Sequence, residues 1–134
     1  MKDLDVFEDN TVFNNKNKEY LFKELISGSR LNNIWAKAIK KDIIDADADY
    51  SEFKDKKSED LLQTLPLFKN ANSVIYLNKA LYNYRLSTTG RGRNFQKKYF
   101  DDLEDVRNVV LEYLIKMDYN NKENLILFYS NYVH

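Results

Sequence analysis

Apolar residues recur three or four positions apart over much of this chain, and this spacing places side chains on one face of an α-helix. The pattern predicts a helix over residues 17–26 and a second over residues 31–44, with Trp35 on its apolar face. Between them stands Ser27-Gly28-Ser29, where glycine can supply the left-handed residue that ends a helix.

A third helix is predicted from residue 58 to about residue 68. Ser58 is of the residue type that favours the N-cap position, and Glu59 and Asp60 follow in the first turn, where carboxylates stabilise the positive end of the helix dipole. Pro66 has no amide hydrogen to donate, so we expect a bend or a loosened middle in this helix.

The longest apolar repeat predicts a helix that starts near Phe95, and a last helix follows from about Lys122. The positions that share the apolar face of the longer helix are Tyr99, Leu103, Val106, Val110, Tyr113 and Met117. Residues 45–57 are mostly polar and charged, which is typical of a surface loop.

Short strands are predicted around residues 73–86. Val74-Ile75-Tyr76-Leu77 is a continuous run of strand-forming residues, and residues 81–86 alternate in character, so we expect one or two strands there. Residues 1–15 can supply at most one strand or hairpin. The predicted fold class is α+β and predominantly α-helical, with about five helices.

Composition narrows the function classes. The 134 residues contain 21 basic and 21 acidic side chains, and this balance argues against a nucleic-acid binder. There is no cysteine, and the single histidine is His134, so we expect neither zinc binding nor thiol or histidine catalysis.

No apolar run approaches the ~20 residues that cross a bilayer, and the start of the sequence is too acidic for a signal peptide. We expect the protein in the cytoplasm, either free or at the inner face of the membrane.

The first candidate motif is acidic. Asp45-Ala46-Asp47-Ala48-Asp49 contains Asp-x-Asp pairs of the kind that can chelate a divalent metal. Such a pair normally follows a buried strand, whereas this one follows a predicted helix, so we interpret it as a solvated acidic loop.

The second candidate is an order of features along the chain. Trp35-Ala36-Lys37 is followed by a variable loop, by Glu59-Asp60 at the start of an apolar helix, by the strand at residues 74–77, and by Tyr84-Arg85 ahead of a Ser/Thr-containing loop. This succession, over roughly residues 20–95, is similar to family 2 glycosyltransferases. The resemblance implies an inverting enzyme that moves a sugar from a nucleotide diphosphate to a glycan or lipid-linked acceptor, in the synthesis of cell-surface polysaccharide.

The resemblance also implies roles for particular residues. Asp60 corresponds to the general base, which removes a proton from the acceptor hydroxyl as that oxygen attacks the anomeric carbon. Glu59 either orients the acceptor or the donor, or is a solvated first-turn carboxylate. Trp35 either packs in the core or stacks on a sugar, and Lys37 lies almost opposite it on the predicted helix. The remaining candidates for substrate binding are cationic and can reach a diphosphate: Arg85, Arg91 and Arg93.

In this family an upstream half binds the nucleotide and ends in a metal-chelating Asp-x-Asp. No alternation of strands and helices precedes residue 17, so we expect residues 1–95 to be the acceptor-side part of a catalytic domain, and residues 96–134 a helical extension packed on it. The intact enzyme is then expected to bind a divalent metal, Mg²⁺ or Mn²⁺, mainly through the missing half, and this fragment is expected to bind none. The fragment alone is expected to be inactive.

A different class of function is also open. The heptad-like spacing from Tyr99 to Met117 would suit a non-catalytic helical interaction module, in which a partner helix covers that face. In that case Glu59 and Asp60 only complement the helix dipole.

Overall fold

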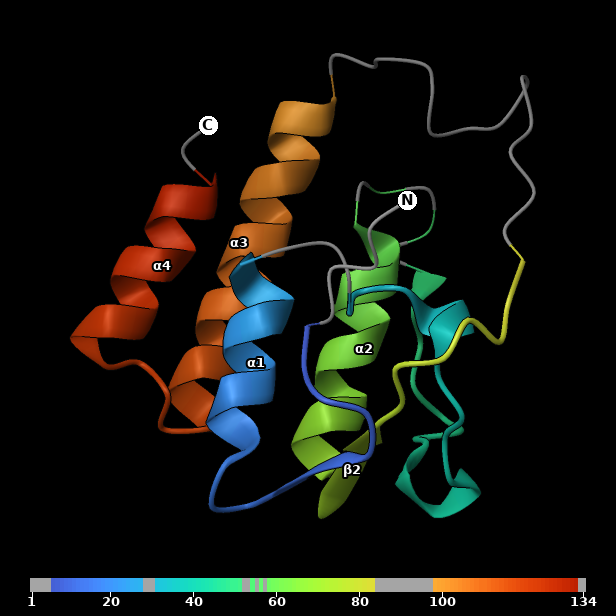
Figure 1. The fold of residues 1–134 in the computed structure, drawn as a ribbon. Coiled ribbons are helices and arrows are strands. Elements are labelled where there is room, and N and C mark those ends of the chain that lie inside the picture. The colour runs from blue at the N-terminus through green and yellow to red at the C-terminus, as the bar shows by residue number, and fades with distance from the viewer. Residues whose placement is uncertain are drawn as a thin grey trace.

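The computed structural model describes residues 6–27, 31–51, 54, 56, 58–83 and 98–132, without the side chains of residues 99, 131 and 132. The fold is α+β and dominated by helices, as the sequence predicts (Figure 1). The elements in chain order are β1 (Thr11–Asn14), α1 (Lys18–Ser27), the 3₁₀ turns η1 (Ile34–Ala36) and η2 (Lys41–Ile43), α2 (Glu59–Asn70), β2 (Ser73–Tyr76), α3 (Tyr99–Lys116) and α4 (Lys122–Tyr132).

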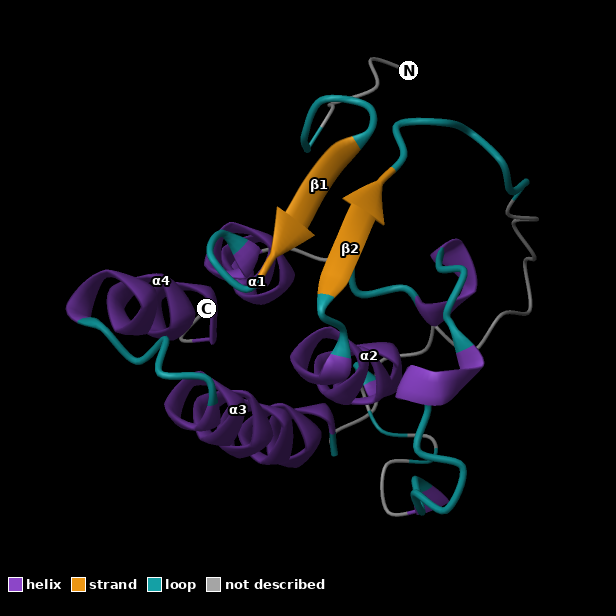
Figure 2. Cartoon of the chain, turned by 90° about the horizontal axis from the view of Figure 1, so that it is seen from below, coloured by secondary structure: helices purple, strands orange, loops and turns teal. Residues whose placement is uncertain are grey.

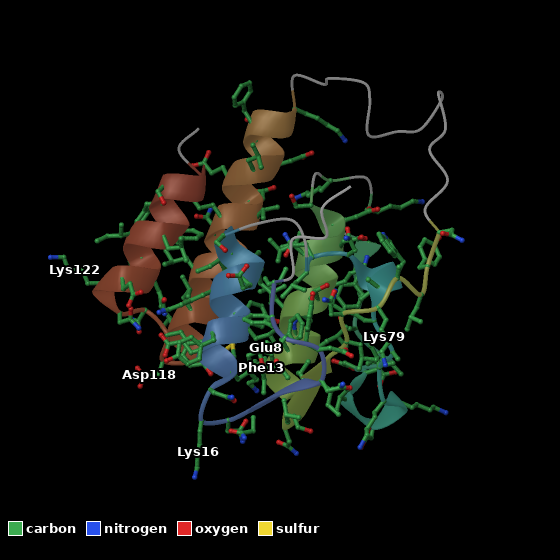
Figure 3. All side chains as sticks on the ribbon, in the orientation of Figure 1. Glu8, Phe13, Lys16, Lys79, Asp118 and Lys122 are labelled. Atoms are coloured by element: carbon green, nitrogen blue, oxygen red, sulfur yellow. The ribbon has the colours of Figure 1, made fainter. Side chains whose placement is uncertain are left out.

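The four α-helices surround a common core, and the two strands lie beside α1 and α2 (Figure 2). The buried cluster joins β1 and all four helices, and its members are Phe13, Leu21, Phe22, Leu25, Ile26, Leu61, Leu62, Leu65, Phe68, Val106, Val110, Leu114 and Phe128. In Figure 3, Phe13 lies among the side chains of the interior, whereas Lys16 and Lys122 extend away from the molecule. Both proposed parts of the chain contribute to this one cluster, and their division at residue 95 stays a prediction.

The sheet is a single antiparallel pair that joins the start of the described chain to its middle. Thr11 is opposite Tyr76, and Val12 is opposite Ile75. The predicted strand at residues 74–77 is thus confirmed as β2, but its partner is β1. Residues 77–83 form no strand, and residues 84–86 lie outside the described part of the chain.

The helices at the two ends of the described chain hold each other through a polar contact. Glu19 Oε1 on α1 accepts hydrogen bonds from Asn121 Nδ2 at 2.8 Å and from Asn124 Nδ2 at 2.7 Å. Asn124 is buried, and its Nδ2 also donates to Tyr119 O at 2.7 Å. This contact fixes α4 against α1, because buried polar groups are stable only where they are hydrogen-bonded.

The long helix α3 begins at Tyr99, and the predicted start near Phe95 lies outside the described residues. Most of the predicted stripe packs within the molecule: Val106 and Val110 are buried, and Tyr113 and Met117 pack against the core. No helix in the part of the chain that the structure describes is long and apolar enough to cross a lipid bilayer.

The predicted helix over residues 31–44 is wrong. That segment contains only the short turns η1 and η2, and the backbone of Asn33, Lys37 and Lys40 is extended. The carbonyls of Leu31 and Asn33, which a helix would bind internally, accept instead from the Lys37 ammonium of the same segment, and the carbonyl of Asn32 accepts from Thr64 on α2. The apolar spacing was real, but other hydrogen bonds satisfy this backbone.

The predicted N-cap position of Ser58 is confirmed, but the cap is not formed by its side chain. Ser58 does precede α2, but its backbone is left-handed, with φ of 65°, and its side chain makes no capping hydrogen bond. Its carbonyl instead accepts from Leu61 N at 3.0 Å and Leu62 N at 3.3 Å. Pro66 lies inside α2, which runs through it to Asn70.

Candidate functional site

The candidate base Asp60 joins two segments that are far apart in the sequence. It lies in the first turn of α2, is partly buried, and accepts a hydrogen bond at Oδ2 from the Ile34 amide at 3.3 Å. The carboxylate therefore sits between the start of α2 and the turn η1, the two segments that contain Glu59-Asp60 and Trp35-Ala36-Lys37.

A buried hydroxyl strengthens this connection one turn further along α2. Thr64 is completely buried, and its Oγ1 lies 2.7 Å from Asp60 O and 3.1 Å from Asn32 O. Its single proton is shared between these two carbonyls. Because a buried hydroxyl needs a partner, this contact keeps the loop before η1 against the helix.

The Lys37 side chain is partly buried and hydrogen-bonds to the loop that precedes η1. Its Nζ donates to Leu31 O at 2.6 Å and to Asn33 O, and lies 5.8 Å from the centre of the Phe68 ring on α2. An ammonium over an aromatic face is attracted by the ring quadrupole. Lys37 is thus bound by three groups of its own protein, which argues for a role in shaping the site.

The charge on Lys37 is sensitive to its surroundings. Burial lowers the pKa of Lys37 from 10.5 to about 8, because desolvation disfavours the ammonium, and the negative charge of Asp60 opposes this shift. Asp60 and Lys37 therefore interact electrostatically, although the sequence analysis assigned them separate roles.

Trp35 lies at the surface of this site. Its side chain is 42% exposed, and its ring centroid is 4.6 Å from that of Tyr82, with 31° between the two planes. Tyr82 is itself 57% exposed and belongs to the segment that follows β2. Of the two interpretations left open for Trp35, the core position is wrong, since the indole is exposed.

The other predicted site residues differ in what the structure says of them. Glu59 is partly buried in the first turn of α2, next to Asp60. Arg85, Arg91 and Arg93 lie outside the described residues. The structure therefore brings Trp35, Lys37 and Asp60 to one region, with Glu59 beside them.

The acidic loop is exposed at all three aspartates, and its carboxylates close local turns. Asp45 Oδ1 accepts from Asp47 N at 3.1 Å, and Asp49 Oδ1 accepts from Ser51 N at 2.8 Å. The hydrogen bond from the Ser51 backbone amide, and after it that from the Ser51 side chain, lowers the pKa of Asp49. Within the described ranges, no three acidic or histidine side chains are grouped so as to hold a metal ion.

A hollow of about 300 Å³ opens away from these residues, at the C-terminal end of α2. It is lined by Asn15, Lys18, Lys69, Lys116, Met117 and Tyr119. Lys18 is buried, and its Nζ donates to Lys69 O at 3.2 Å and to Ala71 O at 2.8 Å. A lysine in this position caps the negative end of α2, so its charge has a structural explanation.

Sequence reasoning missed three residues of the candidate site, and each left a weak signal. Thr64 is a hydroxyl on the apolar face of α2, four residues after Asp60. Tyr82 lies in a stretch dense in tyrosine. Asn32 belongs to the pair Asn32-Asn33 directly before η1. Its Oδ1 is buried and has no hydrogen-bond partner among the described residues.

Comparison of the chain with family models, with curated proteins and with solved structures finds no match. The function of the chain is therefore inferred from its residues and their geometry.

Proposed function

We propose that this chain is the acceptor side of an inverting glycosyltransferase, with Asp60 as the general base. The observation that supports this most is the hydrogen bond between Asp60 Oδ2 and the Ile34 amide. It connects the two segments on which the likeness to family 2 glycosyltransferases depends, although 26 positions separate the bonded residues. In a chain where these motifs had no common role, nothing would require them to meet.

The proposed chemistry is a single displacement. The acceptor hydroxyl oxygen forms a bond to the anomeric carbon of the donor sugar while the bond from that carbon to the nucleotide diphosphate breaks. The hydroxyl proton passes to the Asp60 carboxylate, and the diphosphate leaves with the bonding electron pair. Oδ2 is engaged by the Ile34 amide, so the proton is expected at Oδ1.

The other residues support this role by shaping the site. Lys37 and Thr64 hold the loop that contacts Asp60, and Glu59 is proposed to orient the acceptor or the donor. Arg85, Arg91 and Arg93 are proposed to contact the donor diphosphate, since a guanidinium binds phosphate oxygens in pairs.

The proposal includes partners beyond this chain. We propose a nucleotide-binding half in the same protein, with a Mg²⁺ or Mn²⁺ ion that would neutralise charge on the leaving diphosphate. The acceptor is proposed to be a glycan or lipid-linked glycan used in cell-surface polysaccharide, and the site of action to be the cytoplasm or the inner face of the membrane.

The test is the substitution Asp60→Asn in the protein that joins this chain to its nucleotide-binding half. Asparagine keeps an oxygen that can accept from the Ile34 amide but cannot act as a base, so the fold should be kept. Transfer of labelled sugar from UDP-, GDP- or dTDP-linked donors to endogenous acceptors should fall about 100- to 10,000-fold, the usual contribution of a general base.

The matched control is Glu59→Gln, the same loss of charge at the adjacent carboxylate, for which we expect a smaller loss of transfer. Circular dichroism and thermal midpoints check that both variants fold. Transfer at the wild-type rate by Asp60→Asn would remove Asp60 from the mechanism. A wild-type protein that uses none of the three donor classes would contradict the function itself.

The alternative, a helical interaction module, loses its main support from the sequence. It needs the apolar face of residues 99–117 for a partner, but Val106 and Val110 of that face are completely buried in the core of the chain itself. Those side chains cannot also contact another protein without unfolding this one.

A further inference from the structure

The pair Trp35 and Tyr82 is the main aromatic contact at the surface of the candidate site. Their ring centroids lie 4.6 Å apart, yet the two side chains remain 42% and 57% exposed. They come from η1 and from the segment after β2, so the fold brings together two aromatic rings that are distant in the sequence and keeps both in contact with solvent. Aromatic pairs with this exposure are frequent at binding sites, because a rigid ring offers a large contact area at low entropic cost.

The backbone that presents the indole is fixed on both sides. Ile34, the residue before Trp35, donates its amide to Asp60 at 3.3 Å, and Lys37, two residues after it, binds two carbonyls of the preceding loop. Tyr82 packs against the indole and restricts its rotation. The indole is therefore preorganised, and little of its conformational entropy is lost when a ligand binds to it.

The chemistry of such a surface suits one kind of ligand. A pyranose with equatorial hydroxyl groups has flat faces made of C–H bonds, and these carry small positive charges that the negative face of an aromatic ring attracts. Its hydroxyl groups point outward from the rim of the sugar and remain in water. Glucose and N-acetylglucosamine in β linkage have this shape, whereas an axial hydroxyl group interrupts the flat face.

We infer that the Trp35 and Tyr82 pair is a subsite for a β-linked glucose or N-acetylglucosamine unit of the acceptor. This inference rests on the proposed function and adds to it the substrate class and Tyr82 as a binding residue. Asp60 accepts a hydrogen bond from Ile34, the residue before Trp35, so the proposed base and the proposed subsite are connected through η1.

The chain provides its own reporter for a test. Trp35 is the single tryptophan among 134 residues, so intrinsic tryptophan fluorescence reports on this site alone. Titration of the chain with cellotetraose and with chitotetraose should give a saturable change in emission for at least one of the two, with a Kd on the order of 1 mM, typical of one weakly held unit.

Variants at Tyr82 separate binding at the pair from binding elsewhere. Tyr82→Ala should weaken binding about threefold to tenfold, the usual effect of losing one aromatic contact, and Tyr82→Phe should bind as the wild type does. Tyr129→Ala is the matched control, because Tyr129 is an exposed aromatic residue of α4 at 44%. It should leave binding unchanged.

Two results would overturn the inference: no saturable change with either oligosaccharide, or a change that Tyr82→Ala leaves intact. Self-association in sedimentation that Tyr82→Ala abolishes would assign the pair to a protein contact instead, and would also overturn it. The outcome is distinct from that of the catalytic test. Wild-type transfer by Asp60→Asn removes the base without affecting the titration, whereas a failed titration removes the subsite and leaves the base in place.

Discussion

At the scale of single residues, the most informative side chain is Lys37. The sequence presents it as one of many lysines on a polar helix face, but it is bound to Leu31 O and Asn33 O and lies over the Phe68 ring. Such a position has an electrostatic cost, because an ammonium loses hydration when it is buried. That cost makes the stability of the loop depend on pH.

The prediction for Lys37 compares the wild type with Lys37→Met. In the unfolded chain the pKa of Lys37 is 10.5, and in the fold it is about 8, so between these pH values the unfolded state binds more protons. The free energy of unfolding therefore rises with pH relative to the variant over this window, and the difference is constant below pH 8. Urea denaturation at a series of pH values measures it.

The control for this experiment is Lys41→Met, since Lys41 is exposed in η2. Its stability should follow that of the wild type through the same series. Parallel curves for the wild type and Lys37→Met would contradict the prediction.

At the scale of elements, the segment of residues 31–44 shows how tertiary contacts override an apolar pattern. Its spacing predicts a helix, but Thr64 and Lys37 bind backbone carbonyls that such a helix would use, and Asp60 binds the Ile34 amide. These three partners are not visible in the segment's own sequence beyond Lys37. Among the predicted helices that did form, α1 and α4 have apolar faces and no comparable competitor for their backbone.

The prediction at this scale is that Thr64→Val loosens η1. Valine has the shape of threonine but no hydroxyl, so Asn32 O loses its buried partner, at a cost of about 1–3 kcal/mol in the free energy of unfolding. Hydrogen exchange of the Ile34 amide should become faster.

Thr11→Val is the matched control. The Thr11 hydroxyl donates to Glu8 O at 2.7 Å in an exposed position, where water can replace it. A Thr64→Val chain with unchanged exchange at Ile34 would contradict this account of the loop.

At the scale of the whole molecule, the core joins the beginning and the end of the described chain. Phe13 of β1, the apolar faces of α1 and α2, and Leu114 and Phe128 near the C-terminus belong to one buried cluster. A cluster shared in this way predicts cooperative unfolding, in which the two parts on either side of residue 95 lose structure together.

Leu114→Ala tests this cooperativity. The substitution should lower the free energy of unfolding by about 2–5 kcal/mol, because it removes buried methyl groups and leaves a cavity. The denaturation midpoint reported by Trp35 fluorescence should fall together with the midpoint from circular dichroism, although Trp35 is on η1. Ile115→Ala, the next residue and 57% exposed, should change stability by about 0.5 kcal/mol or less. Separate midpoints for the two signals would show independent parts.

The sequence by itself determined the elements whose apolar spacing has no rival use for the backbone: α1, α2, β2, most of α3, and α4. It also determined the acidic first turn of α2, because Glu59 and Asp60 directly precede the apolar run. These features are local, since periodicity and helix-terminal preferences act over a few residues.

Only the tertiary structure decided the pairing of β1 with β2, the loss of the helix at residues 31–44, and the meeting of Trp35 with Tyr82. Each depends on contacts between segments that are dozens of residues apart. The contacts are the backbone ladder between β1 and β2, the buried hydroxyl of Thr64 on the loop before η1, and the ring contact of Trp35 with Tyr82, none of which leaves a periodic pattern in the chain.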